Sequence, residues 1–280
     1  MILKELKIKS WMGDATNCYI VQDEESKETM VIDPAGDVDK IVEMLDILQA
    51  KLKYIYLTHC HGDHTGAVTE LKNRRGGKIL INRIESENLN NPSVTLNYYI
   101  GMPDIELETD SRIDDDDLIH LGNIEFKVIH TPGHTNGSTS LYCEEEKMLF
   151  SGDTIFHGTW GRTDLPTGGF TDIMDSITNK ILLLPDDTII YPGHGKSTMV
   201  KEEKPIYQGM WGILEVGLVS FGTCTMTALI IMTTGVLQTG DTGAILVLNA
   251  FQNNFGILRK SHIGYYNSIV CVYVISWIFC

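Results

Sequence analysis

Short apolar runs, separated by polar and glycine-containing segments, make up most of the first 210 residues. Runs of this composition between turn residues predict β-strands. They are residues 17–21, 29–33, 53–57, 78–81, 124–129, 138–142, 147–153 and 188–193. Over residues 38–48 and 171–184, apolar side chains recur at three- and four-residue spacing, which predicts two amphipathic helices. Strands mixed with helices favour an α/β protein in which helices pack on sheets.

The pattern changes near residue 210. No charged residue occurs from Val216 to Gly240 or from Ile263 to Cys280. Because about 18–20 apolar residues can span a bilayer, residues 208–280 are predicted to be an apolar, membrane-type helical tail, attached to a membrane through residues 216–280. A pair of buried core segments is the alternative. The chain is therefore expected to have two domains, residues 1–207 and residues 208–280.

Composition and charge narrow the class of protein. The chain has 22 Lys and Arg against 37 Asp and Glu, which gives a net charge of −15 and argues against a nucleic-acid partner. Its six cysteines form no CxxC pair and do not indicate a disulfide scaffold. The N-terminal residues lack the apolar segment of a signal peptide, so a cytoplasmic location is expected for the first domain.

The densest group of candidate metal-binding residues lies in YLTHCHGDHTGAV, residues 56–68. This segment follows directly on a predicted strand and contains His59, His61, Asp63 and His64. A loop at a strand end can direct several side chains to one point, and imidazole with carboxylate is a common ligand set for metals such as zinc. Histidine-rich loops also arise by chance, so further ligands are needed to support a metal site.

Three later segments supply such residues. His134 lies in HTPGHTNGS, Asp153 in LFSGDTIF and His194 in YPGHGKST. Each lies at or just past the end of a predicted strand and has glycines beside it, which let the backbone turn sharply. Four strand-end segments that together carry five histidines and two aspartates predict a common metal centre. His130 is expected to pack or to support a ligand, and His157 lies in a loop that could face the site.

The order H-x-H-x-D-H, followed by a distant His, an Asp and a final His, resembles the signature of the metallo-β-lactamase superfamily over residues 1–207. The resemblance implies an αββα sandwich, in which two mixed sheets pack face to face with helices outside and metals at one edge. It implies two divalent metal ions, with Zn²⁺ as the first expectation and Fe or Mn as alternatives. The first metal would be bound by His59, His61 and His134, the second by Asp63, His64 and His194, and Asp153 would bridge them.

Within the superfamily the chain resembles the short bacterial glyoxalase II group, the hydroxyacylglutathione hydrolases. TNCYIV (16–21), VIDPAGD (31–37), HTPGHTNGS (130–138) and GDTIFHGTWGRTDLPTG (152–168) carry this resemblance. It implies hydrolysis of a small-molecule thioester by a metal-bridging hydroxide, with Asp63 as a ligand that also orients this nucleophile. Arg162 would bind a substrate carboxylate, or alternatively form a structural salt bridge with Asp164.

Other readings stay open at this stage. A persulfide dioxygenase-like oxidoreductase would use one iron, and a lactonase would use the same site on another substrate. The tail resembles a fragment of a sodium:alanine symporter, through CTMTALII (224–231) and the later TGA and AFQ. The acidic residue usual before CTMTAL is missing, so working transport is not expected, although a membrane-tethered protein is an alternative. The sequence does not indicate the oligomeric state.

Overall fold

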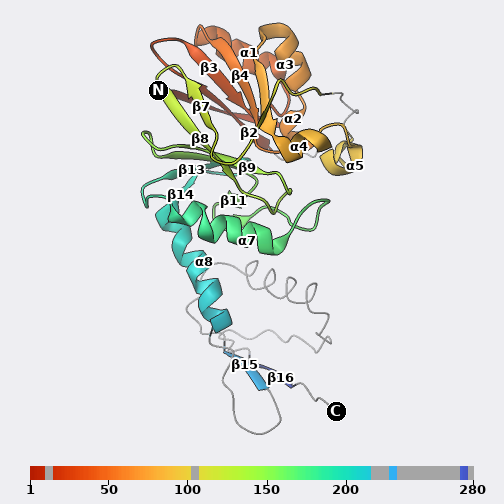
Figure 1. The fold of residues 1–280 in the computed structure, drawn as a ribbon, viewed down its shortest axis with the longest axis vertical. Helices are drawn as coiled ribbons and strands as arrows, with labels where there is room; N and C mark the ends of the chain where they lie inside the picture. Colours follow the sequence, from red (N-terminus) through yellow and green to blue (C-terminus); the bar gives the residue numbers. More distant parts are fainter. Residues whose placement is uncertain (10–14, 102–106, 216–226, 232–271, 277–280) are drawn as a thin grey trace. The chain divides into compact units, whose positions relative to one another are not determined.

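The computed structural model describes residues 1–9, 15–101, 107–215, 227–231 and 272–276 (Figure 1). The chain divides into two compact units, residues 1–204 and residues 205–280. The first unit contains both large sheets and every candidate ligand named above.

A six-stranded sheet is built from the first part of the chain. β1, β2 and β3 run antiparallel, whereas β3 to β6 run parallel. Helices α1 (Val38–Ile47) and α3 (Val68–Arg75) connect parallel strands and cover the outer face of this sheet (Figure 1). The strands lie in chain order: β1 (Ile2–Lys9), β2 (Ala15–Gln22), β3 (Glu28–Ile32), β4 (Lys51–Leu57), β5 (Lys78–Asn82) and β6 (Ser111–Ile113).

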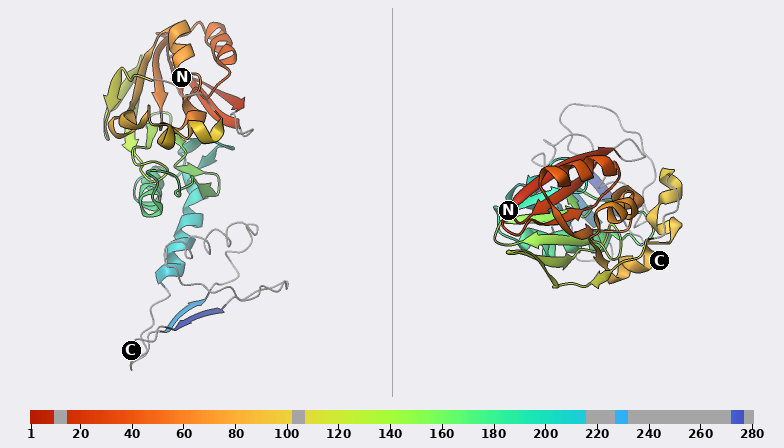
Figure 2. Two further views of the ribbon diagram at one scale, coloured as in Figure 1. Left: turned by 90° about the vertical axis from the view of Figure 1, so that its right-hand side faces the viewer. Right: turned by 90° about the horizontal axis from the view of Figure 1, so that it is seen from above.

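A second six-stranded sheet follows, with the order β14-β13-β10-β9-β8-β7. β10 and β13 are parallel, and the other neighbours are antiparallel. Helix α7 (Phe170–Asn179) lies on the outer side of this sheet, so four layers are visible (Figures 1 and 2). The strands are β7 (Leu118–Leu121), β8 (Ile124–His130), β9 (Thr139–Cys143), β10 (Met148–Gly152), β13 (Ile189–Pro192) and β14 (Thr198–Met199).

Two apolar layers explain why the central strands read as continuous apolar runs. Along β2, Cys18 and Ile20 belong to the cluster that also contains the buried face of α1. The intervening Tyr19 and Val21 belong to the cluster between the sheets, together with Phe126 of the second sheet. A strand that is buried on both faces has no polar face in its sequence.

The α/β architecture predicted from the sequence is confirmed, and each predicted strand is observed within two residues of its predicted bounds. β1 was not predicted, because it is an edge strand and Lys4, Glu5, Lys7 and Lys9 occupy its exposed positions. The predicted helix over 171–184 is broken. At Lys180 the backbone leaves the helical region, and a 3₁₀ turn, η1 (Ile181–Leu183), follows.

Short elements complete the edge of the sandwich at which the candidate ligands lie. Helix α2 (Gly62–Thr65) begins directly after His61. The other short elements are α4 (Arg83–Asn88), α5 (Pro92–Thr95), α6 (Asn97–Ile100), β11 (Ile155–Phe156) and β12 (Thr159–Trp160). β11 and β12 pair as a small hairpin after Asp153.

The tail is described only in part. Helix α8 (Val200–Glu215) contains the division between the two units, and β15 (Thr227–Ile231) pairs antiparallel with β16 (Val272–Ser276). These two segments were predicted to be helical and are instead strands, which agrees with their content of β-branched residues. Among the residues described, no helix is long and apolar enough to cross a membrane. The rest of the predicted membrane-type stretch, 216–226, 232–271 and 277–280, lies outside the described residues.

Candidate metal centre

The candidate ligands lie where strands of both sheets end. β3 and β4 are parallel neighbours, so Asp33 and Thr58, the residues that follow them, lie side by side. β10 and β13 are also parallel, and Asp153 and His194 follow their C-terminal ends. β8 has the same direction as β10, since both are antiparallel to β9, and His134 follows β8. Topology therefore brings together residues that are distant in sequence.

Three imidazoles form the first cluster (His59, His61 and His134). His61 Nδ1 lies 3.1 Å from His59 Nε2 and 2.9 Å from His134 Nε2. All three residues are buried, with exposed fractions of 1%, 2% and 4%. His59 and His61 come from the loop after β4, whereas His134 comes from the loop between β8 and β9.

The second cluster (Asp63, His64 and His194) contains a carboxylate and is more open. His194 Nε2 lies 3.3 Å from His64 Nε2 and 3.3 Å from Asp63 Oδ2. The side chain of His64 is fully buried, but those of Asp63 and His194 are 25% and 26% exposed. This cluster therefore provides the solvent-facing side of the site.

Asp153 lies between the two clusters. Its Oδ1 is 3.4 Å from His64 Nε2, and its Oδ2 is 3.4 Å from His194 Nε2 and 3.6 Å from His134 Nε2. Oδ1 is buried and has no hydrogen-bond partner within the described part of the chain. One carboxylate thus reaches the donor atoms of both clusters.

The outer nitrogens of the second-cluster histidines are held by acceptors. His64 Nδ1 donates to the Asp33 carboxylate at 2.9 Å, and His194 Nδ1 donates to the Ala15 carbonyl at 3.1 Å. Because these oxygens can only accept, each Nδ1 carries the ring proton and each neutral ring has its lone pair at Nε2. Two lone pairs then face each other at 3.3 Å, which only a proton or a cation between them can relieve.

The first cluster is organised in the same way. His134 Nδ1 donates to the Arg162 carbonyl at 2.8 Å. Thr58 Oγ1 donates to Asp33 at 2.7 Å, so it accepts from His59 Nδ1 at 3.0 Å. Both rings therefore point an Nε2 lone pair at His61 Nδ1, and one proton on that atom could satisfy only one of them.

The spacing of the donor atoms fits a metal. Ligands at about 2.1 Å from a tetrahedral ion are about 3.4 Å apart, and the closest donor pairs in the two clusters are 2.9–3.4 Å apart. Gly193 lies against two of the candidate ligands and leaves no room for a side chain. An added Cβ there would lie 2.2 Å from Asp153 Oδ1 and 2.6 Å from a carbon of the His64 ring. The residues present thus suit a pair of divalent cations.

Electrostatics support the same conclusion. Although burial opposes it, the charge of Asp153 and a hydrogen bond to Asp63 raise the pKa of His194 to about 10. Burial also opposes ionisation of Asp63, yet the neighbouring His64 and His194 lower the pKa of that carboxyl to about 2. In contrast, burial and the nearby His134 lower the pKa of His61 to about 3. The second cluster is negative enough to attract protons or a cation, whereas burial keeps His59 and His61 of the first cluster neutral.

Arg162 contributes to the site through its backbone. Its carbonyl holds His134, while its guanidinium forms two hydrogen bonds of 2.9 Å with Asp164. Both of these side chains are about two-thirds exposed, at 67% and 66%. The salt bridge considered from the sequence is therefore formed, and a role of the guanidinium in substrate binding stays a prediction.

Sequence reasoning did not assign roles to Asp33 and Thr58. Asp33 accepts from the Thr58 backbone N–H at 2.9 Å as well as from the Thr58 hydroxyl and His64, and it is buried. It thereby fixes one histidine of each cluster. The available signal was its position directly after a strand, in VIDPAGD, next to the strand that leads into the His59 loop.

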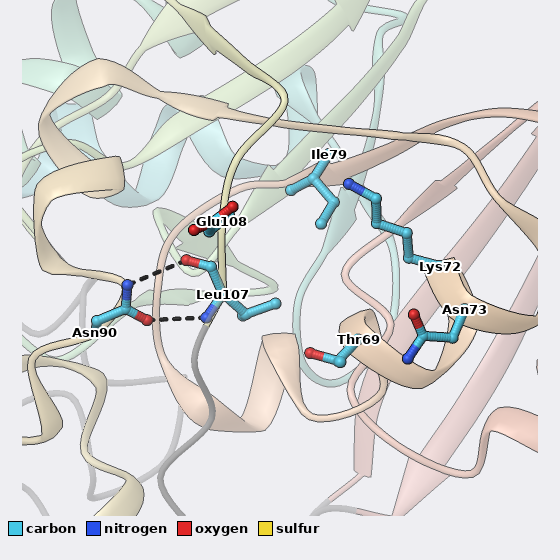
Figure 3. A pocket seen from close by; sticks show the side chains of 7 residues that line it. All are labelled: Thr69, Lys72, Asn73, Ile79, Asn90, Leu107 and Glu108. Carbon is cyan, nitrogen blue, oxygen red and sulfur yellow. Dashed lines mark hydrogen bonds between the residues drawn. The ribbon is translucent and has the colours of Figure 1, made fainter.

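The remaining candidates, His130 and His157, belong to neither cluster. His130 Nε2 is 2.9 Å from the Asn136 carbonyl, and His157 Nδ1 is 3.2 Å from Thr198 Oγ1. A pocket of about 400 Å³ is bordered by α3. The residues that line this pocket include Lys72 and Asn73 but none of the seven candidate ligands (Figure 3). It is a separate feature from the metal centre.

Comparisons with known proteins agree with this geometry. Residues 11–194 match the metallo-beta-lactamase superfamily, and residues 194–279 match the sodium:alanine symporter family. Hydroxyacylglutathione hydrolase GloC of Haemophilus influenzae is 34% identical over 190 residues, which are 67% of this chain and 89% of that protein.

Solved structures show the same likeness. BLEG-1 B3 metallo-beta-lactamase has a TM-score of 0.68 and 33% identity, over 73% of this chain and 97% of that one. TTHA1623 in a di-iron-bound form has a TM-score of 0.63 and 27% identity, over 72% of this chain and 96% of that one. The match over residues 11–194 and the identity to these relatives show that the chain belongs to the metallo-β-lactamase superfamily.

Proposed function

We propose that this chain is a dinuclear metallo-hydrolase that cleaves small acyl thioesters of the hydroxyacylglutathione type. The observation that carries the proposal is the convergence of seven donor side chains, with opposed lone pairs, into two clusters that share Asp153. The first metal is assigned to His59, His61 and His134, and the second to Asp63, His64 and His194. A site with one iron would leave the donors of the other cluster without a metal.

Two divalent ions held here would supply Lewis acidity and lower the pKa of a coordinated water. The chain's own groups do the rest. Asp63, whose low pKa keeps it ionised at neutral pH, has a partly exposed carboxylate that can accept a hydrogen bond from the attacking water and orient it. Asp33 holds Thr58 and His64, and the Arg162 carbonyl holds His134, so the donor atoms are fixed before substrate binds.

A thioester suits this set of groups. A thiolate is a better leaving group than an alkoxide or an amide, so its departure requires no dedicated general acid. The likeness to GloC, named as a hydroxyacylglutathione hydrolase, supports the same substrate class. Zn²⁺ is the metal we propose first, with Fe or Mn as alternatives. Because TTHA1623 has been solved in a di-iron-bound form, the metal analysis must include iron.

The proposal is tested on the full-length chain by metal analysis and a panel of substrates. Two metals per chain and hydrolysis of S-lactoylglutathione in preference to a lactone or a β-lactam are expected. One iron per chain with oxygen uptake on a persulfide would support the oxidoreductase instead. Asp63→Asn should abolish most of the hydrolysis, whereas Asp116→Asn, in an exposed turn with φ of 67° that asparagine tolerates, should not change it.

The division at residues 207 and 208 is also a proposal. A chain that ends at Tyr207 is expected to stay in solution without detergent and to hydrolyse S-lactoylglutathione as the full chain does. Thr198 and Glu203, which interact with the β11–β12 region, are retained in it. Complete loss of activity in this shorter chain would show that residues 208–280 belong to the enzyme.

A further inference from the structure

Glu85 is a buried carboxylate that the proposed reaction does not use. It lies in α4, a helix of six residues, and is the buried residue of that helix, with an exposed fraction of 0%. Asn82 is the N-cap of this helix, and its side chain accepts from the Ile84 N–H at 2.9 Å. Burying a carboxylate is costly unless its oxygens are hydrogen-bonded, so the partners of Glu85 indicate what it is for.

Both oxygens of Glu85 accept backbone N–H groups from loops that carry metal ligands. Oε2 accepts from Cys60 at 2.8 Å, and Oε1 accepts from Gly137 at 2.9 Å. Cys60 lies between His59 and His61, and Gly137 lies three residues after His134. Hydrogen bonds to an ionised acceptor are stronger than those between neutral groups. One side chain thus ties together two loops that are far apart in sequence.

The contact at Gly137 is close. An added Cβ there would lie 2.8 Å from Glu85 Cγ, Oε1 and the backbone nitrogen. No side chain can be placed at this position without moving the loop or the helix. Glycine therefore lets the loop between β8 and β9 reach the carboxylate.

The two clusters differ in how far they depend on this link. The first cluster takes His59 and His61 from one of the tied loops and His134 from the other, and its shortest donor pair, at 2.9 Å, crosses between them. The second cluster takes no ligand from the His134 loop. A change in the spacing of the loops should therefore affect the first cluster most.

We propose that Glu85 is a positioning residue, which sets the distance between the two loops and thereby the affinity of the first metal site. This inference rests on the proposed two-metal centre. A glutamine has nearly the same shape but carries an NH₂ group in place of one oxygen. That group would face a backbone N–H, so Glu85→Gln should release one of the two loops.

The test isolates each metal site in the full-length chain. In a His194→Ala background, Co²⁺ titration of the metal-free protein reports the first site, and in a His134→Ala background it reports the second. Glu85→Gln is expected to weaken Co²⁺ binding at the first site by about 10- to 100-fold, the range found for residues that support metal ligands. At the second site it is expected to change binding by less than about threefold, a much smaller loss than that range.

Glu203→Gln is the matched control. Glu203 is equally buried and also accepts a backbone N–H, that of Gly158, at 3.1 and 3.0 Å. Its other polar contacts in the described part of the chain are with Thr198 and His157, which lie outside the two tied loops. It should share the general cost of altering a buried carboxylate without selective loss at the first site. Gly137→Ala, whose added Cβ would push the loop away from Glu85, should reproduce the selective loss if Glu85→Gln does not fold.

Amide hydrogen exchange in the metal-free protein gives a readout without metal. Glu85→Gln should speed exchange at Cys60 or Gly137 and leave Gly158 unchanged. Equal weakening of both sites, or unchanged exchange at both amides, would overturn the role of Glu85. If instead the parent chain binds no more than one metal, the two-metal centre fails, and the exchange result still shows whether Glu85 holds the loops.

Discussion

The two ligand clusters are neighbours, but they are built differently. The first cluster (His59, His61 and His134) is buried and consists of imidazoles alone, and burial lowers the pKa of His59 and His61. The second cluster (Asp63, His64 and His194) includes a carboxylate, and its outer members are about one-quarter exposed. An enclosed cluster of imidazoles suits a metal that is bound tightly. A negative, open cluster suits a metal that meets water and substrate.

Asp153 is the feature that joins the clusters, so its removal should have the largest effect. Asp153→Ala is expected to weaken metal binding at both sites and to lower kcat/KM by more than about 100-fold, above the range for residues that only support ligands. Metal content and thioester hydrolysis measured on the same sample check this. Full metal content at one site would show that Asp153 serves one cluster alone.

Lowering the pH should release the metal of the second cluster before that of the first. In the metal-free protein the pKa of His194 is raised to about 10, so at neutral pH a metal must displace a proton there. The affinity of the second site for its metal should therefore fall by about tenfold per pH unit for each displaced proton. For one proton this is a loss of about 100-fold from pH 8 to pH 6. The pKa of His61 is lowered to about 3, so no proton competes there in this range. Competition with a chromophoric chelator should show one metal leaving first, and simultaneous release would contradict the comparison.

Replacing Asp33 should weaken both metal sites, with a smaller difference between them than acidification produces. Asp33→Asn places an NH₂ group where His64 Nδ1–H or Thr58 now donates. Metal affinity is expected to fall about 10- to 100-fold, more at the second site than at the first, because His64 contacts Asp33 directly and His59 only through Thr58. Co²⁺ titration checks this, with Asp116→Asn as the control. A larger loss at the first site would reverse the assignment.

Replacing Arg162 should have the smallest effect on metal binding and hydrolysis. Its side chain is exposed and bound to Asp164, while its backbone carbonyl holds His134 whatever the side chain. Arg162→Ala is therefore expected to leave metal content unchanged and to raise KM by at most about tenfold, the equivalent of about 1.4 kcal/mol. Steady-state kinetics with S-lactoylglutathione check this, and a fall in kcat alone would exclude substrate binding as its role.

The sequence predicted eight of the twelve strands of the two large sheets, because most of these eight are short apolar runs bounded by turn residues. It also singled out all seven candidate ligands, since each follows a strand end and stands beside glycine or another ligand. The edge strand β1 was missed, because its exposed positions are charged. The break at Lys180 was missed as well, because apolar spacing continues through it while the backbone does not.

By itself, the sequence determined which residue types are available for metal binding and which family the chain resembles, because ligand chemistry and motif order are local properties. The resemblance implied how the donors divide between two metals, and the tertiary structure brings these donors together in two clusters and gives supporting roles to Asp33, Thr58 and Glu85. These roles depend on which strands are parallel neighbours and on which loops meet a buried carboxylate. Such contacts join residues up to 52 positions apart, and no local pattern encodes them.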